Sequence, residues 1–384
     1  MPKNYNHSIM IARTLEPEIT ERILPNKVML VLGARRVGKT VLMREICNKF
    51  QGKYLFLNGE DFDTQTLLEK KSAANYRSII GDNELLVIDE AQAIPDIGAK
   101  LKLIVDEIPN IRVLASGSSS FDLLNKAGEP LVGRSTGFTL YPFSQQELSS
   151  IENRLQTRQE LENRLIYGAY PEVSTMKLAH QKQEYLTEIV NAYLLKDILM
   201  LEGIRNTTKV KDLLKLIAFQ AGSEVSYEEL SRQLSISKNT VEKYLDLLSK
   251  VFVIFRLGGF SRNLRKEITK TGKWYFTDTG IRNAIIGDFN PLSLRQDVGL
   301  LWENYLISER IKKNSNALQF SKYYFWRTYD GQEIDLIEEN NSRLQAFEFK
   351  WKNKFVKTPA AFAAAYPEKP FSVVNRENYL EFIL

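Results

Sequence analysis

Residues 27–50 read KVMLVLGARRVGKTVLMREICNKF, and this one stretch narrows the possible folds more than any other part of the chain. After Lys27, residues 28–32 form a continuous apolar run, which is typical of a strand buried on both faces. A glycine-rich bend follows at 33–40, and apolar side chains then recur at helical spacing. A strand, a GxxxxGK[ST] loop and a helix in this order predict a P-loop.

The chemistry of such a loop predicts ATP and Mg²⁺ as ligands. Its glycines let backbone N–H groups point at the β-phosphate, and the helix N-terminus adds its dipole. Lys39 would reach the β/γ-oxygens, and Thr40 would ligate Mg²⁺. Arg35 and Arg36 either touch phosphate or are simply solvated. The nucleotide-binding residues expected on this basis are Gly33, Ala34, Arg35, Arg36, Val37, Gly38, Lys39, Thr40 and Val41.

A second buried strand, ELLVIDEAQ, ends in Asp89-Glu90. An acid at the carboxyl end of a strand beside the P-loop strand can hold Mg²⁺ through water, so we expect Asp89 in this role. Glu90 would orient or deprotonate the attacking water. The other interpretation is an ordinary strand-to-helix turn with acidic caps.

Two further segments supply candidate polar contacts. The strand IRVLASGSSS ends in Ser116–Ser120, where Ser118, or next to it Ser119, would touch the γ-phosphate or the water; otherwise this is only a loop. Arg134, in LVGRSTGFTLYP, would reach a phosphate in cis or across a subunit boundary, or would pair with a surface acid. Together the strands predict a parallel α/β sheet with the nucleotide at their carboxyl ends.

The segments GARRVGKT, LLVIDEAQ, ASGSSSFDLL and LVGRSTGFTLYPFSQQEL resemble a widespread prokaryotic group of AAA+-type ATPases. Members of this group pair the ATPase with an uncharacterised C-terminal domain. The resemblance covers nearly the whole chain and implies ATP hydrolysis, with Lys39, Thr40, Asp89 and Glu90 in the roles given above.

Residues 206–273 predict a winged helix-turn-helix: a helix, a capped second helix, a turn, a third helix and a β-rich segment. They hold 13 Lys and Arg against 7 Asp and Glu, so their net charge of +6 exceeds the +5 of the whole chain. Such a basic segment suits a polyanion such as double-stranded DNA. Such folds also dock proteins, and a basic surface can be merely solvated. Expected outward residues of the third helix are Lys238, Asn239, Thr240, Lys243 and Tyr244, while Arg262, Arg265 and Lys266 would touch phosphates from the wing.

The last part of the chain resembles the PD-(D/E)xK fold of restriction-type nucleases. Glu303 lies in an amphipathic helix, Asp335 in a strand, and Glu348 and Lys350 two apart in the next strand. The three carboxylates would share a divalent metal, and Lys350 would polarise the scissile phosphate. Some proteins keep this fold and lose the cleavage.

Composition excludes other classes. No apolar run approaches the ~20 residues of a membrane span. The start, MPKNYNHSIM, lacks the layout of a signal peptide, and the single Cys47 suits a reducing compartment, so we expect a cytoplasmic protein. One Cys and two His make a zinc site unexpected.

The predicted organisation is an α/β P-loop parallel sheet ATPase domain at 1–145, a helical lid or connector at 146–205, a winged helix-turn-helix at 206–270 and a small α/β nuclease-like domain at 271–384. The leading hypothesis is an ATPase whose nucleotide state controls a DNA-binding, DNA-cleaving C-terminal half. The alternative is an ATP-dependent switch or scaffold that binds a protein partner and carries an inert nuclease-like fold. An Arg134 that acts in trans would require a homo-oligomer.

Overall fold

The computed structural model of the chain describes residues 11–118, 131–194, 206–261 and 272–384. These residues group into two compact units. The N-terminal unit comprises Ala12–Pro142 and Lys250–Phe252, and the C-terminal unit comprises Phe143–Ser249 and Val253–Leu384 together with Ile11. The predicted lid, winged-helix and nuclease-like segments therefore lie almost wholly in one unit, and their separation into domains stays a prediction.

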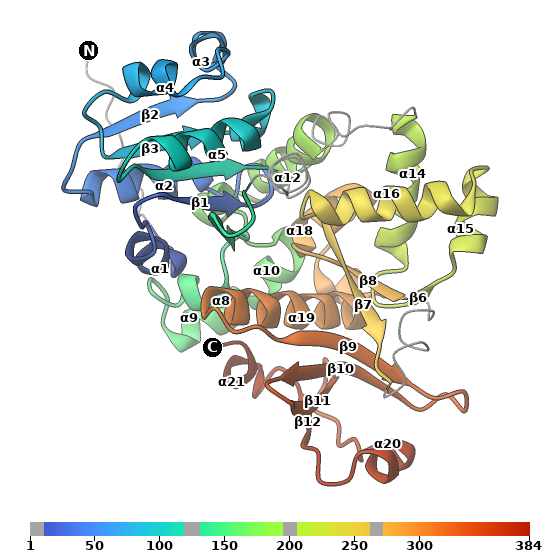
Figure 1. Cartoon of the computed structure of the whole chain (residues 1–384). Helices are drawn as coiled ribbons and strands as arrows, with labels where there is room; N and C mark the ends of the chain where they lie inside the picture. The colour runs from blue at the N-terminus through green and yellow to red at the C-terminus, as the bar shows by residue number, and fades with distance from the viewer. Residues whose placement is uncertain (1–10, 119–130, 195–205, 262–271) are drawn as a thin grey trace. The chain divides into compact units, whose positions relative to one another are not determined.

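The N-terminal unit is built on the parallel sheet that the sequence predicts (Figure 1). Its order is β2-β3-β4-β1-β5, and every pair is parallel. β1 and β3 are buried almost throughout, because neighbouring strands and helices cover them on both faces. The strands are β1 (Lys27–Leu32), β2 (Tyr54–Asn58), β3 (Leu85–Asp89), β4 (Arg112–Gly117) and β5 (Ser135–Thr139).

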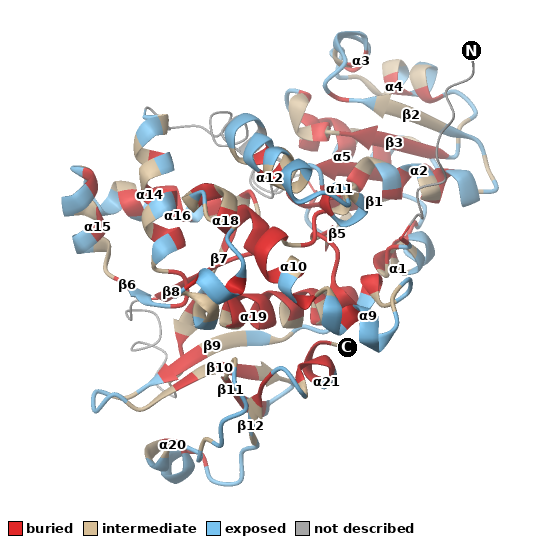
Figure 2. Cartoon of the chain, turned by 180° about the vertical axis from the view of Figure 1, so that it is seen from behind, coloured by how far each residue is buried: buried red, intermediate tan, exposed pale blue. Residues whose placement is uncertain are grey.

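Helices and a 3₁₀ turn cover this sheet, and three of its strands share an apolar core with two of the helices (Figure 2). β3 and β4 contribute fully buried branched side chains, including those of Ile88 and Val113, and α5 contributes Leu101. The covering elements are α1 (Leu15–Glu21), α2 (Lys39–Lys49), α3 (Phe62–Leu67), α4 (Ala73–Ile80), η1 (Ala91–Ala93) and α5 (Ile97–Glu107).

The C-terminal unit begins with short helices and continues with a three-helix segment. Among its described residues and those of the N-terminal unit, no helix combines the length and the apolar character that crossing a bilayer requires. Its early elements are α8 (Gln145–Leu148), α9 (Arg154–Gln159), α10 (Leu161–Tyr167), α11 (Pro171–Thr175), α12 (Ala179–Glu188) and the π-helical η2 (Ile189–Leu194). The three-helix segment is α14 (Thr207–Phe219), α15 (Tyr227–Leu234) and α16 (Lys238–Lys250).

A seven-stranded mixed sheet, of order β12-β11-β10-β9-β7-β8-β6, runs through the C-terminal unit. β7 is antiparallel to β8 on one side and parallel to β9 on the other, so the hairpin that follows α16 and the C-terminal strands form one sheet. The strands are β6 (Glu224–Val225), β7 (Ile254–Gly259), β8 (Gly272–Phe276), β9 (Lys322–Arg327), β10 (Glu333–Asn340), β11 (Arg343–Phe349) and β12 (Phe371–Val374).

The long helix α19 packs against this sheet through β8 and β11, and against α21. Its Trp302 is completely buried, and Figure 2 shows much of the helix in the colour of buried residues. The helices of this part are α18 (Thr279–Ile286), α19 (Val298–Asn316), α20 (Ala360–Ala365), α21 (Tyr379–Ile383) and the 3₁₀ turn η3 (Leu292–Leu294).

A buried ion network ties α18 to the start of α19. Arg295 donates to both oxygens of Asp297 at 2.8 Å, and Arg282 ion-pairs with the same carboxylate. Burial raises the pKa of Asp297, but hydrogen bonds and charge from Arg295 and Arg282 outweigh it and lower the pKa to about 2.

One close approach fixes the end of β1. Leu140 N donates to Leu32 O at 2.7 Å, and a Cβ on Gly33 would lie 2.2 Å from Leu140 O. The residue after β1 must therefore be glycine, because a side chain there would collide with backbone that cannot yield.

Replacing Asp297 by Asn should lower the free energy of unfolding at pH 7 by about 2 kcal/mol. The folded pKa lies below the unfolded value, so this stabilisation is present above about pH 4 and is lost as the pH falls toward 2. Urea unfolding at pH 7 and pH 3 measures the difference. The exposed turn variant Asp330→Asn is the matched control, and an equal loss at both pH values would contradict the assignment.

Gly33→Ala should lower the midpoint of thermal unfolding by several degrees, because the added methyl group forces the loop away from Leu140. Gly137→Ala, in the neighbouring β5, is the control, since nothing lies within 4 Å of its Cβ position. Calorimetry without nucleotide checks both. Equal unfolding temperatures for the two variants would show that the close approach carries no constraint.

Candidate functional site

The loop of residues 33–38 leaves β1 at the carboxyl edge of the parallel sheet and leads into α2. Gly33 N donates to Gly117 O at 3.2 Å, which ties the loop to the end of β4. Gly38 has φ +96° and Arg36 has φ +65°, so the chain turns in the left-handed region twice before the helix begins. The buried Arg13 donates to Val37 O, and to Tyr141 O at 3.2 Å, and so braces the loop.

Lys39 is the first residue of α2 and is only 4% exposed. Its Nζ donates to Gly33 O at 3.0 Å and to Ala34 O at 3.1 Å, and it lies 4.0 Å from Glu90 Oε1. The Lys39 ammonium therefore lies over the loop, next to the residue that follows β3.

Asp89, at the end of β3, is brought beside Thr40. Thr40 Oγ1 donates to Asp89 Oδ2 at 2.6 Å. Ser116 Oγ donates to Asp89 Oδ1, and Glu90 N donates to the same oxygen at 3.1 Å. The hydroxyl and the carboxylate are both oxygen ligands. Proteins bind Mg²⁺ with a few such ligands together with the phosphates of the substrate.

A glutamine joins two of the predicted residues. Gln92 Nε2 donates to Glu90 Oε2 at 2.5 Å and to Ser118 Oγ at 3.2 Å. Glu90 itself takes a left-handed conformation, φ +48°, at the start of the η1 turn. The sequence prediction did not include Gln92, although it is the only polar residue of the η1 turn that follows the Asp-Glu pair. It also did not assign a role to Ser116, and Ser119 lies outside the described residues.

Arg134 lies at the amino ends of the parallel strands, opposite the carboxyl edge that carries the loop. Its carbonyl oxygen accepts from Val28 N, at the start of β1, whereas the loop follows the end of that strand, roughly 16 Å away along the strand. Its guanidinium pairs with Asp106, with Nε 2.7 Å from Oδ1. The expectation of a phosphate contact in cis is therefore wrong, and the pairing with a surface acid is what the structure shows. A role in trans stays a prediction.

The Arg35 side chain is not simply solvated, because it pairs with an acidic residue. Its Nη2 lies 3.3 Å from Glu60 Oε1, and its side chain is 11% exposed. Glu60 follows β2, so this pair connects the loop to a third strand of the sheet. Arg36 is exposed.

In the C-terminal unit the structure gathers the acidic residues singled out by the sequence. Phe349 N donates to Asp335 Oδ2 at 2.7 Å, which ties the β10 carboxylate to β11, and Lys350 Nζ lies 2.5 Å from Glu348 Oε1. Tyr275 OH donates to Glu303 Oε1 at 2.6 Å.

Burial raises the pKa of Glu303, even though Lys273 and the Tyr275 hydroxyl act in the opposite direction. Burial also raises the pKa of Asp335 well above its ordinary value, and the nearby carboxylates of Glu303 and Glu348 raise it further. The carboxylates of Glu303 and Glu348 are therefore close enough to Asp335 to disfavour its charge.

The geometry of this cluster does not by itself show the predicted metal site. Across the described ranges, no group of three or more Asp, Glu, His or Cys side chains is arranged to hold a metal ion. One oxygen each of Glu303, Asp335 and Glu348 faces Tyr275, a backbone N–H and Lys350, while Glu348 Oε2 is buried without a hydrogen-bond partner among the described residues. The predicted ligand set therefore stays a prediction. Lys273, which was not predicted, adds a second cation, which is buried, lies 3.8 Å from Glu303 and is ion-paired with Glu333.

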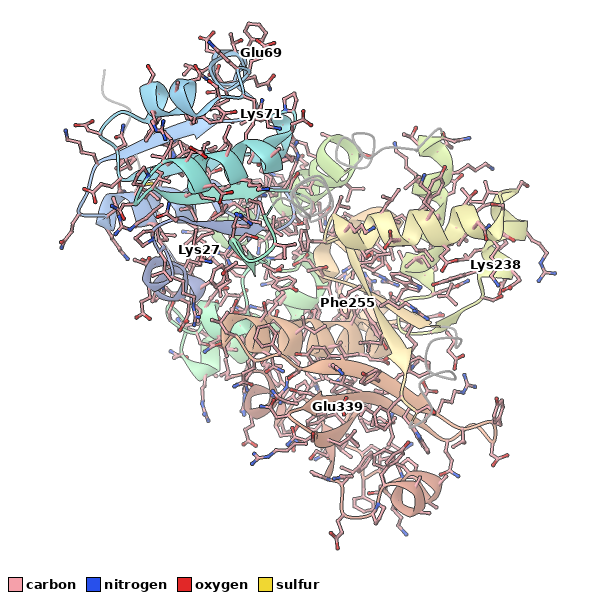
Figure 3. All side chains as sticks on the ribbon, viewed as in Figure 1. Lys27, Glu69, Lys71, Lys238, Phe255 and Glu339 are labelled. Carbon is pink, nitrogen blue, oxygen red and sulfur yellow. The ribbon has the colours of Figure 1, made fainter. Side chains whose placement is uncertain are left out.

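The outward face of α16 agrees with the prediction except at one residue. Lys238, Asn239 and Lys243 are exposed and Thr240 is half-buried. Tyr244, expected outside, is 5% exposed, because its position turns inward with the neighbouring Leu245. Lys238, labelled in Figure 3 at the α15 end of α16, ion-pairs with Glu228. Arg262, Arg265 and Lys266 lie outside the described residues.

Three parts of the chain match models of protein families. Residues 25–149 match the family model described as an AAA domain. Residues 158–292 and 298–382 match two domains of unknown function, DUF8612 and DUF4143.

The relatives are bacterial and archaeal. The uncharacterized protein Rv2008c of Mycobacterium tuberculosis is 28% identical over 328 residues, which cover 84% of this chain and 70% of that protein. The uncharacterized protein MJ1544 of Methanocaldococcus jannaschii is 24% identical over 363 residues, covering 89% of this chain and 80% of its own length.

Among solved structures, the Walker-type ATPase PABY2304 of Pyrococcus abyssi superposes with a TM-score of 0.50 at 14% identity. The match covers 73% of this chain and 97% of that one, and it shows a shared fold. The AAA-domain match at residues 25–149 and this shared fold agree with the P-loop geometry of the N-terminal unit.

Proposed function

We propose that the N-terminal unit binds ATP with Mg²⁺ and hydrolyses it. The observation that carries this proposal is that two pairs of residues, far apart in the sequence, meet at one edge of the sheet. Thr40 lies within hydrogen-bond distance of Asp89, and Lys39 lies within ion-pair distance of Glu90. Nucleotides bind at this carboxyl edge in open α/β sheets.

Each residue has a chemical task in this proposal. The backbone N–H groups of residues 33–41 and the start of α2 cradle the phosphates, and Lys39 neutralises the β- and γ-oxygens. Thr40 and Asp89 would hold Mg²⁺, which neutralises phosphate charge when bound. Thr40 and Asp89 are already aligned by their 2.6 Å hydrogen bond, so neither has to change position greatly.

Glu90 is proposed as the residue that orients the attacking water and accepts its proton. Its carboxylate is only partly exposed, at 18%, and is positioned by Gln92 on one oxygen and Lys39 near the other. Gln92 also contacts Ser118, so the side chain proposed to sense the γ-phosphate is connected to the proposed base through one amide.

For the C-terminal unit, we propose that α14, α15, α16 and the β6-β8-β7 strands act as a winged helix that binds double-stranded DNA, under control of the nucleotide state. The order of these elements and the exposed Lys238, Asn239 and Lys243 support this. The Lys238–Glu228 pair weakens the basic face, which favours the alternative of a protein-docking scaffold. The ion-paired acidic cluster likewise favours an inert nuclease-like fold over cleavage.

Lys39→Ala and Glu90→Gln should each lower the rate of ATP turnover at least a hundredfold, since one removes phosphate charge compensation and the other the base. Glu90→Gln should still bind nucleotide, whereas Lys39→Ala should bind it weakly. Phosphate release and nucleotide affinity measure the two effects. The exposed Lys71→Ala is the control, and it should match the parent. Turnover at the parental rate in both site variants would refute the assignment.

Lys243→Ala should weaken binding to duplex DNA and reduce by about one the slope of log affinity against log salt, because one phosphate contact is lost. Lys322→Ala, an exposed lysine at the start of β9, is the control. Fluorescence anisotropy at several salt concentrations, with and without an ATP analogue, gives both quantities. No binding at low salt would support the scaffold instead.

A further inference from the structure

The C-terminal unit contains a pocket of about 620 Å³ to which neither the proposed ATP site nor the proposed DNA-binding helix contributes. Its wall is formed by α9, the start of α10, the η3 turn and two short segments that follow β11 and β12. The lining includes Arg158, Trp351, Lys352, Arg376 and Tyr379. The volume lies within the range of small-molecule binding sites.

Three cations of the lining are linked by contacts that bring them to one place. Arg158 Nη2 donates to Glu377 O at 3.4 Å, and this carbonyl directly follows Arg376. The Arg376 guanidinium lies 4.6 Å from the centre of the Trp351 ring, and Lys352 is the next residue after that ring. All three cationic side chains are exposed at the pocket.

The two acids of the lining are already engaged by N–H donors. Glu377 Oε2 accepts from Asn353 Nδ2 at 3.0 Å, and Glu162 Oε1 accepts from Leu292 N at 3.0 Å. Three cations against two acids, each partly occupied, leave the pocket with an excess of positive charge. Guanidinium groups favour phosphate through paired, charge-assisted hydrogen bonds.

The aromatic wall is rigid. Trp351 and Tyr379 both pack edge-on against the fully buried Trp302, with ring centroids 5.4 Å apart in each case. Tyr379 is also fully buried, and within the described residues its hydroxyl has no hydrogen-bond partner. This hydroxyl has almost no accessible surface, so Tyr379 serves the pocket only as part of its wall.

From this arrangement we infer that the pocket binds a nucleoside phosphate, either as a free nucleotide or as the 5′-phosphorylated end of a nucleic-acid strand. Arg158, Lys352 and Arg376 bind the phosphate, and the base lies against the Trp351–Arg376 pair, since planar bases stack on aromatic rings and on guanidinium groups. The inference does not rest on ATP hydrolysis, because no residue of the pocket belongs to the N-terminal unit.

The test uses the full chain carrying Lys39→Ala, so that the P-loop contributes little binding. The probes are thymidine 5′-monophosphate and a 3′-labelled thymidine hexanucleotide with and without a 5′-phosphate. Calorimetry measures binding of the monophosphate, and fluorescence anisotropy measures binding of the hexanucleotide. We expect the 5′-phosphate to tighten binding at least tenfold, and Arg158→Gln and Arg376→Gln each to reverse that gain. Arg343→Gln, an exposed arginine at the start of β11 and away from the lining, should change affinity less than twofold.

The two sources of the phosphate are distinguished by the probes. Similar affinities for the monophosphate and the phosphorylated hexanucleotide indicate a free nucleotide, and tenfold tighter binding of the hexanucleotide indicates a strand end. No binding of either probe, binding indifferent to the 5′-phosphate, or binding indifferent to both arginine variants would overturn the inference. ATP turnover of the chain with Lys39 intact is measured separately, so that loss of one site is not mistaken for loss of the other.

Discussion

Every part of the candidate ATP site depends on the parallel hydrogen bonding of β1 between β4 and β5. This central position buries β1 and delivers the 33–38 loop to the edge where β3 and β4 also end. Asp89 reaches Thr40, and Ser116 reaches Asp89, because their strands run in the same direction and stop at the same level. Side chains far apart in the sequence thereby meet at the glycine-rich loop.

Much of the N-terminal unit could be predicted because its signals are local. An apolar run, a glycine-rich bend and helical spacing determine the β1–loop–α2 unit, and the Asp-Glu pair that ends β3 indicates its partner. Gln92 was missed because its role arises only from the left-handed turn at Glu90, which aims its amide at both Glu90 and Ser118. No pattern in the sequence records that geometry.

Other expectations needed tertiary information. Arg134 was placed near phosphate because it precedes a strand, but the start of a parallel strand is the wrong end for such a contact. Tyr244 was assigned outward from helical spacing alone, and packing of α16 turned it inward. The acidic residues of the C-terminal unit do meet, yet spacing could not show that Lys273 would join them from another strand.

The parallel pairing of β7 with β9 has a consequence for dissecting the chain. A fragment that ended between β8 and β9 would leave β7 with unpaired backbone groups along an edge that the native chain covers. Such an edge invites association with other strands, so α14–α16 and the strands of the seven-stranded sheet are best regarded as one cooperative folding unit. Natural or designed domain exchanges that preserve this unit would have to cut before α8, because α10 and α12 also pack against α18.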